Sequence, residues 1–340
     1  EILAQAGLAV AIVEEGPLRT SSDFKMLESE AYPALYQDSA SRQTADKAIK
    51  ILQGRCVGGS TTVNWTSSFR TPPATLQWWQ TAHGLKNLSV DAMAPWFAAM
   101  EQRLHVGLWP LPPNDNNAAL ARGAAQLGIP VAVIPRNVKM CWNLGYCGMG
   151  CPTNAKQSML LTTIPAALTR GATLISRLRA EKLEFSGNKA VALEALALKP
   201  DGLMPSGIQV SLRARHFVLA GGAINTPALL MRSHAADPHG RLGKRTFLHP
   251  TLISAALFDK PIRAYAGAPQ SVYSDHFLTQ AAVDGPLGFK LEVAPLHPIL
   301  FSTTLHGWGE AHARLMREFA NSQTTLALVR DGFHPESSGG

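Results

Sequence analysis

Residues 1–17 read EILAQAGLAVAIVEEGP, and this stretch decides the fold. Residues 1–6 look like the end of a helix, and Gly7 is its natural C-terminal cap. The unbroken apolar run Leu8–Val13 is typical of a strand that is buried on both faces of a parallel sheet. A carboxylate, Glu14, follows at the carboxyl end of that strand. This order predicts the second half of a β-α-β unit.

The position of Glu14 makes a dinucleotide site one interpretation of that unit. In such sites a carboxylate about 20 residues after a glycine fingerprint binds the ribose hydroxyls. Only 13 residues precede Glu14, so we expect the glycine loop to lie upstream of residue 1, in a longer protein. The other interpretation is a solvated strand end. Residues 1–17 alone leave both open.

The amino-acid composition limits the classes of protein to which the chain can belong. The 340 residues are 46% hydrophobic and 16% charged, which is typical of a globular chain with one large domain or two ordinary ones. The formal charge is +7, but the 31 Lys and Arg are scattered, so we expect no nucleic-acid partner. No stretch approaches the ~20 apolar residues of a transmembrane helix. Four cysteines are too few for a disulfide scaffold.

The second informative stretch is GRCVGGSTTVNWTSSFRTP, residues 54–72. Gly58 and Gly59 leave backbone N–H groups unscreened by side chains, and Ser60 and its neighbours add hydroxyl donors. Because glycine permits close approach, such a loop can wrap a pyrophosphate or the edge of a ring cofactor. A glycine pair alone would indicate only a turn, whereas the whole 54–72 string is a more specific signal of a cofactor-binding loop.

The string resembles the first signature of the glucose–methanol–choline (GMC) flavoprotein oxidoreductases, which has the form G-R-x-V-G-G-S-T-x-x-N followed by an aromatic residue. The residues that fit it in order are Gly54, Arg55, Val57, Gly58, Gly59, Ser60, Thr61, Asn64, Phe69 and Pro72. The segment GAINTPALLMRS at 222–233 resembles the second signature, although His234 stands where the family has glycine. A third similarity is Leu242-Gly243-Lys244, which leads to His249-Pro250.

The resemblance implies FAD as the cofactor. It implies that Glu14 holds the adenosine ribose and that the loop Gly54–Asn64 lies along the pyrophosphate and the flavin. It places the backbone of Ala180 against the adenine. It also implies that the chain returns to the cofactor at Ala220, Gly221 and Ala223.

The implied fold class is α/β. It combines a Rossmann-like parallel sheet with helices, which binds FAD, and part of an antiparallel-sheet substrate domain. We expect a discontinuous FAD-binding domain over residues 1–250, with an inserted helical segment at about 85–135. A partial substrate-binding domain covers 251–340.

Local patterns predict further elements. Ser89 caps a helix that runs to about Leu104 and carries an apolar face, and a second helix over 118–127 ends at Gly128. A short helix covers 162–170, and residues 173–220 read as β-rich with turns at 186–188 and 200–202. The apolar residues on the first helix are Met93, Trp96, Phe97, Met100 and Leu104. A short apolar run at 217–219 precedes Ala220.

Three cysteines, Cys141, Cys147 and Cys151, lie in one glycine-rich loop. Three thiols could hold part of an iron–sulfur cluster, and zinc would want a fourth ligand that no nearby His offers. Because the ligand set is incomplete, we expect a structural loop and name no metal ligand. Cys56, inside the glycine string, reads as a small buried residue.

The implied reaction is FAD-dependent oxidation of an alcohol, a small molecule with a CH–OH group, to an aldehyde or ketone by hydride transfer. An aliphatic alcohol is the first expectation for the substrate, and the electron acceptor, the oligomeric state and the compartment stay open. We name no catalytic residue, because His249, His297, His306 and His334 lie outside the family's catalytic context. Each reads as a surface or satisfied polar residue. We therefore expect these 340 residues alone to show no turnover.

Two other interpretations of the chain as part of an enzyme remain. A nicotinamide-linked dehydrogenase would share the β-α-β unit but not the 54–72 string. An iron–sulfur electron-transfer subunit would use the cysteine loop. A non-catalytic binding protein is the third alternative.

Overall fold

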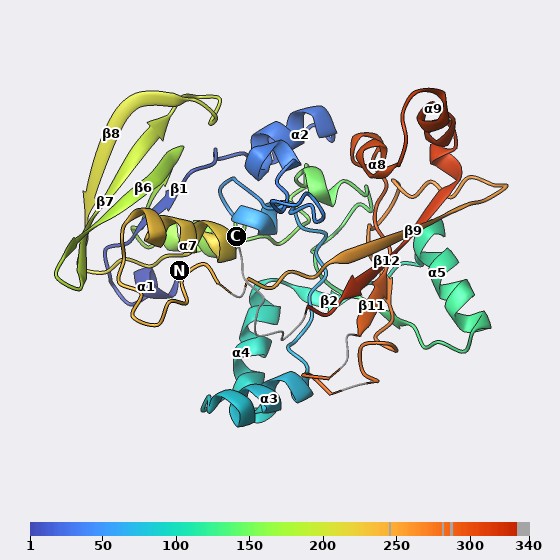
Figure 1. Cartoon of the computed structure of the whole chain (residues 1–340), viewed down its shortest axis with the longest axis horizontal. Helices are drawn as coiled ribbons and strands as arrows, with labels where there is room; N and C mark the ends of the chain where they lie inside the picture. The colour runs from blue at the N-terminus through green and yellow to red at the C-terminus, as the bar shows by residue number, and fades with distance from the viewer. Residues whose placement is uncertain (245, 281, 286–287, 332–340) are drawn as a thin grey trace.

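The computed structural model describes residues 1–244, 246–280, 282–285 and 288–331. Two groups of strands lie at opposite ends of the molecule, and the glycine-rich string runs between them (Figure 1). The first group holds strands β1 and β5 to β8, and the second holds strands β9, β11 and β12.

The N-terminal unit has the predicted order. Helix α1 (Ile2–Gln5) ends before Gly7, which has a φ of +80°. Strand β1 (Ala11–Glu14) then pairs in parallel with β5 (Thr173–Ser176). Ala4 of α1 and Ala167 of α6 (Thr163–Leu168) cover one face of β1 through Ile12. The expectation of burial on both faces was wrong, because β1 is only half-buried and pairs, within the described residues, with β5 alone.

An antiparallel sheet follows β5, as the β-rich pattern predicts. Its order is β6 (Leu178–Ser186), β7 (Lys189–Leu198) and β8 (Pro205–Arg213). Helix α7 (Gly222–Arg232) packs on β6, and the Ser233 hydroxyl accepts a hydrogen bond from Leu183 N at 2.8 Å. The apolar run at 217–219 is not a strand, and Val218 is 76% exposed. Within the described residues no strand pairs with this run, so it forms no ladder of backbone hydrogen bonds despite its apolar side chains.

The second sheet is antiparallel, with β12 (Ser322–Val329) between β11 (Phe289–Glu292) and β9 (Thr251–Leu257). Helix α5 (Asp115–Gln126) packs on it: the side-chain amide of Asn116 donates to Ala294 O, and its oxygen accepts from Thr324 N. Helices α8 (Pro298–Thr304) and α9 (Gly309–Arg317) lie at its outer end (Figure 1). The predicted antiparallel sheet beyond residue 250 is therefore present.

Short elements connect the two ends. Helix α2 (Glu28–Leu35) packs against the glycine-rich string, and β2 (Val106–Leu108) pairs with β4 (Pro135–Asn137). Strand β3 (Ala132–Val133) pairs with β10 (Val272–Tyr273). Single 3-10 turns form at Ser21–Asp23, Gln37–Ala40, Gly59–Thr62, Cys147–Met149 and Phe319–Asn321.

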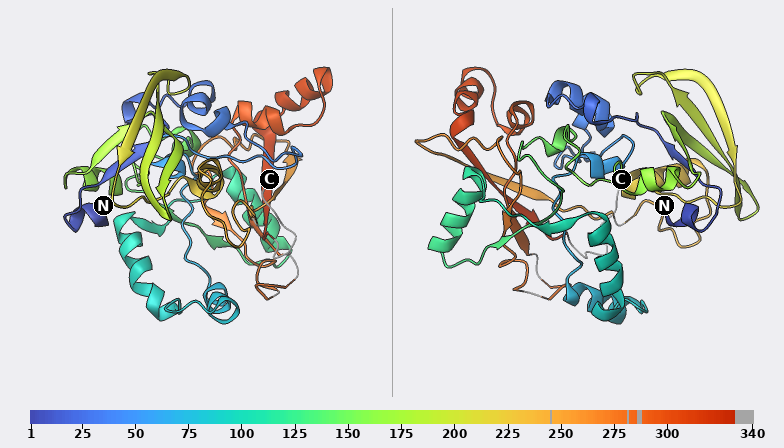
Figure 2. Two further views of the ribbon diagram at one scale, coloured as in Figure 1. Left: turned by 60° about the vertical axis from the view of Figure 1, so that its left-hand side comes forward. Right: turned by 180° about the vertical axis from the view of Figure 1, so that it is seen from behind.

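Helices α3 (Pro73–His83) and α4 (Val90–Arg103) extend away from both sheets (Figure 2). Ser89 caps α4 as predicted, because its hydroxyl accepts from Ala92 N at 3.2 Å. The predicted apolar face is present in the sequence but is not buried in the structure, where Trp96 is 67% exposed. No helix among the described residues is both long and apolar enough to span a bilayer.

Candidate functional site

The carboxylate of Glu14 lies at the end of β1, where the chain turns toward the glycine-rich string. Its Oε1 accepts a hydrogen bond from Gly16 N at 2.7 Å. Burial raises the pKa of Glu14 to about 7; the Gly16 N–H and Arg55 oppose this rise, and Glu15 adds to it. A carboxylate in such surroundings is stabilised by further hydrogen-bond donors.

Gly16 brings β1 and the string into direct contact. A Cβ at this position would lie 2.2 Å from the carbonyl oxygen of Arg55, so no residue other than glycine fits without a shift of the backbone. Val57 N also donates to Pro17 O at 3.1 Å. Two stretches that the sequence singled out separately therefore form one structural unit.

The string makes a tight loop that holds its own backbone. Gly58 and Gly59 have φ values of +92° and +57°, a region that favours glycine. Gly54 N donates to Ser60 Oγ at 2.9 Å, and Thr61 Oγ1 donates to Gly58 O at 2.6 Å. A Cβ on Gly59 would meet no atom within 4 Å, so the loop faces open space there.

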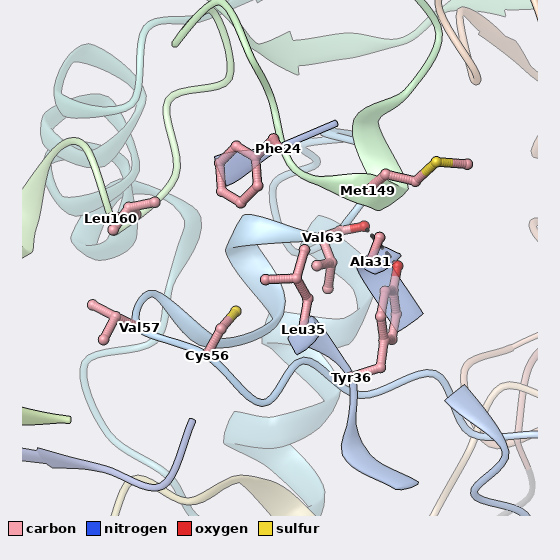
Figure 3. Packing of buried hydrophobic residues seen from close by; sticks show 9 residues of the cluster. All are labelled: Phe24, Ala31, Leu35, Tyr36, Cys56, Val57, Val63, Met149 and Leu160. Atoms are coloured by element: carbon pink, nitrogen blue, oxygen red, sulfur yellow. Dashed lines mark hydrogen bonds between the residues drawn. The ribbon is translucent and has the colours of Figure 1, made fainter. Parts of the chain in front are cut away.

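The underside of the string is anchored in the largest buried apolar cluster (Figure 3). Cys56 is fully buried, as predicted, and burial raises the pKa of its thiol to about 12. The Tyr36 hydroxyl donates to Gly148 O at 2.6 Å and lies 3.4 Å from Val63 O, so it ties α2 to the cysteine loop. The residues of the cluster are Phe24, Ala31, Leu35, Tyr36, Cys56, Val57, Val63, Met149 and Leu160.

Arg55 is a buried cation inside the string. One guanidinium nitrogen, NH1, donates to Gly202 O at 2.6 Å and lies 3.5 Å from a carboxylate oxygen of Glu15. The other, NH2, is buried and has no hydrogen-bond partner within the described part of the chain. A buried N–H without a partner costs free energy, so this donor is available to a ligand.

The start of α7 lies beside the start of the string. The guanidinium NH1 of Arg42 is 2.9 Å from Gln53 Oε1 and 2.9 Å from Asn225 Oδ1, and it bridges them. Ala220, Gly221 and Ala223 are exposed around the first turn of α7. The structure therefore brings these three residues to the string.

Ala180 lies elsewhere on this side of the molecule. It is on β6, and its carbonyl oxygen accepts from Arg232 NH2, at the far end of α7, at 3.4 Å. The structure thus places Ala180 at one end of α7 and the string at the other.

The far end of the string contacts β10 and the neighbouring second sheet. Ser67 Oγ donates to Gln270 Oε1 at 2.8 Å, and the Phe69 ring packs edge-on against Tyr273 with centroids 4.9 Å apart. The ammonium group of Lys290 lies 4.2 Å from the Phe69 centroid. The string therefore links the parallel strands to the predicted substrate domain.

Two buried cations that no sequence pattern singled out lie under the string. Lys156 Nζ donates to the carbonyl oxygens of Thr62, Asn64 and Cys147, and Arg136 Nε donates to Thr66 Oγ1. One signal could have indicated Arg136: a single charge ends the otherwise apolar run at 129–135.

The cysteine loop does not gather its thiols into a metal site. Among the described residues, no group of three His, Cys, Asp or Glu side chains is arranged to hold a metal ion. Cys141 Sγ accepts from Asn143 N at 3.4 Å, and Cys151 Sγ accepts from Lys156 N at 3.5 Å. The expectation of a structural loop stays a prediction.

The histidines occupy surface or satisfied positions where they are described. His297 is buried, its Nε2 lies 3.3 Å from Gly145 O, and burial lowers its pKa. His249 and His306 are exposed. His334 lies outside the described residues.

A parallel strand that ends in a half-buried carboxylate and packs directly on a glycine-rich loop is typical of a nucleotide-binding α/β protein. The chain belongs to the GMC oxidoreductase family, because the sequence profile of that family matches residues 32–251. This confirms the resemblance drawn from the 54–72 string. FAD is the cofactor of this family, and the fold is that of its FAD-binding members.

Two relatives and one solved structure illustrate the similarity. An uncharacterised GMC-type oxidoreductase of Mycobacterium tuberculosis is 32% identical over 97% of this chain and 51% of its own length. A long-chain-alcohol oxidase of Arabidopsis thaliana is 26% identical over 97% of this chain and 45% of its own length.

The solved structure is the Aspergillus oryzae formate oxidase, at a TM-score of 0.62 and 14% identity, over 99% of this chain and 70% of that one. Its likeness shows the fold. The chain spans about half the length of the two curated relatives it matches here.

Proposed function

We propose that this chain binds FAD and forms the cofactor-binding part of an enzyme that oxidises an alcohol to an aldehyde or ketone. The observation that carries the proposal is the junction of Glu14, Gly16 and Arg55. It joins a strand-end carboxylate to the signature loop.

The residues of the junction suit the chemistry of FAD. The ribose hydroxyls are hydrogen-bond donors. Hydrogen bonds from them to Glu14 would offset the rise that burial causes in its pKa. The unpartnered NH2 of Arg55 is a donor for an anionic or carbonyl oxygen. Gly59 leaves room for close approach to the loop backbone.

Each predicted cofactor residue takes a role in this proposal. Glu14 binds the adenosine ribose, Gly54–Asn64 follows the pyrophosphate and flavin, and Ala180 meets the adenine. Ala220, Gly221 and Ala223 close the site from α7. The proposed division into a 1–250 FAD domain and a 251–340 substrate domain agrees with the break between the two sheets, although α5 packs on the second sheet.

Bound FAD supplies a flavin ring that accepts hydride from the alcohol carbon. The protein's part is to bind, orient and exclude water. The string, buried on one side by α2 and the cysteine loop, holds the cofactor in a fixed position. The name of the Arabidopsis relative supports an aliphatic alcohol as the substrate class.

A titration of the cofactor-free protein with FAD tests the proposal. We expect saturable binding to the wild type, seen as quenching of flavin fluorescence, and weaker binding to Glu14→Gln. Glu30→Gln, which removes an exposed carboxylate on α2, is the matched control and should bind as the wild type does. Binding of NAD in preference to FAD would overturn the proposal in favour of the nicotinamide alternative.

A further inference from the structure

Two fully buried cations lie beneath the part of the string that leads to the second sheet. Lys156 is 3% exposed and Arg136 is 1% exposed, while Ser60 and Asn64 of the string are exposed above them. Lys156 comes from the segment after the cysteine loop, and Arg136 from β4. Separate parts of the chain thus deliver two positive charges to one buried region.

Lys156 is bound entirely by carbonyl oxygens. Its Nζ donates to Thr62 O at 2.8 Å, Asn64 O at 2.6 Å and Cys147 O at 2.7 Å. Three acceptors use all three N–H bonds of an ammonium group. They satisfy its hydrogen bonds, but they leave its charge without a counterion.

Arg136 lacks both a counterion and one hydrogen-bond partner. Its Nε donates to Thr66 Oγ1 at 2.8 Å, and its NH2 lies 3.4 Å from Trp65 O and 3.6 Å from Cys147 Sγ. The guanidinium carbon lies 4.7 Å from the centroid of the Trp109 ring. Its NH1 is buried with no partner among the described residues.

No Asp or Glu side chain forms an ion pair with either cation in the described residues. Burial, with Arg136 adding to it, lowers the pKa of Lys156 to about 8, and the thiols of Cys147, Cys151 and Cys56 oppose the fall. The three carbonyl acceptors at 2.6–2.8 Å favour the protonated, charged form of Lys156. A buried positive charge without a counterion destabilises the fold unless an anion comes close to it.

We propose that Lys156 and Arg136 form a cationic support under residues 62–66 that stabilises the negative charge gained by the flavin on reduction. This inference rests on the proposed function, which lays the string along the flavin. Hydride transfer gives the ring two electrons and one proton, so the ring gains one negative charge. Nearby positive charge favours that state, and it raises the reduction potential of the bound cofactor. Both are positioning residues, because they act through the string.

The test measures the two-electron reduction potential of the FAD-loaded protein and the dissociation constant of oxidised FAD. In Lys156→Met we expect the equilibrium constant for reduction to fall about tenfold or more, which for two electrons is a drop of about 30 mV. The affinity for oxidised FAD should change by less than about threefold, because its ring is neutral. Lys156→Arg should restore the wild-type potential.

The controls separate charge from packing. Arg317→Met removes a charge of the same sign from an exposed ion pair with Glu310 on α9, outside the string, and it should leave the potential unchanged. Cys147→Ser removes the thiol beside Arg136 and should also leave it unchanged. A higher potential in Cys147→Ser would show that the thiol already neutralises the support, and it would overturn the inference. If Lys156→Met does not fold, Lys156→Gln and Arg136→Gln, which keep donors but no charge, make the same comparison.

Two further results would contradict the inference. An unchanged potential in the folded neutral variants would show that the charges do not act on the ring. A tenfold loss of affinity for oxidised FAD at constant potential would show that the two charges act on the pyrophosphate and not on the ring. Failure of the wild type to bind FAD would instead refute the proposed function, so the two failures are distinguishable.

Discussion

Replacement of Glu14 by glutamine should stabilise the cofactor-free protein while it weakens the cofactor site. Burial raises the pKa of Glu14 from its usual 4.5 to about 7 in the folded chain. Glutamine has the same shape, keeps an oxygen for the Gly16 N–H and has no charge to bury. The substitution therefore removes one ionisation and retains the hydrogen bond.

The sign and size follow from proton linkage. Between pH 4.5 and about 7 the folded state holds a proton on Glu14 that the unfolded state has lost, so wild-type stability falls as pH rises through this window. At 1.36 kcal/mol per pH unit the fall is at most about 3 kcal/mol. The variant lacks this fall. Its advantage over the wild type should be near zero at pH 4.5 and approach about 3 kcal/mol above pH 7.

Urea unfolding of both proteins without FAD, at about pH 5 and about pH 8, measures this difference. Glu292, whose pKa burial also raises to about 7, is common to both proteins and cancels in the comparison. With FAD present the order should reverse, because ribose hydroxyls bind the ionised carboxylate. A variant that is no more stable than the wild type at pH 8, or equally stabilised at both pH values, would refute the reasoning.

Three other predictions concern the site and its supports. Gly16→Ala should destabilise the fold by about 3 kcal/mol or more, since its Cβ would lie 2.2 Å from Arg55 O. The control Gly107→Ala, where a Cβ would meet no atom within 4 Å, should change stability by less than about 1 kcal/mol. Comparable unfolding midpoints of the two variants would contradict this. Glu28→Ala should cost about 2–4 kcal/mol, because Glu28 is buried and accepts the first N–H groups of α8; urea unfolding measures it. Cys56, fully buried, should resist iodoacetamide until the chain unfolds, and alkylation in the folded state, read by mass spectrometry, would show that the string opens.

The local elements and the family could be predicted from the sequence because their signals are local. The cap at Ser89, the glycine after α1 and the 54–72 string each depend on a few neighbouring residues. The contact between Gly16 and Arg55 could not be predicted, although both residues were noted, because nothing in their spacing shows that the two stretches touch.

Burial was the weaker part of the prediction. An apolar run at 217–219 and an apolar stripe on α4 are patterns of burial, but burial depends on which elements pack against them. The buried cations Lys156 and Arg136 were missed for the opposite reason. A charged residue in a sequence reads as a surface residue, and only the fold shows that backbone carbonyls surround it.

The string that begins against Gly16 and ends in the ring contact between Phe69 and Tyr273 has a consequence for the evolution of this enzyme class. A mutation at Tyr273, on β10 beside the second sheet, acts on a ring contact that also holds the end of the string. Phe69 is joined to Gly54 by 15 residues of backbone, so a change at Tyr273 that moves Phe69 acts on the same segment that carries the glycines. Under the proposed function, in which the string holds FAD and residues 251–340 bind the substrate, substrate range and cofactor geometry are inherited together, and divergence in one is limited by what the other tolerates.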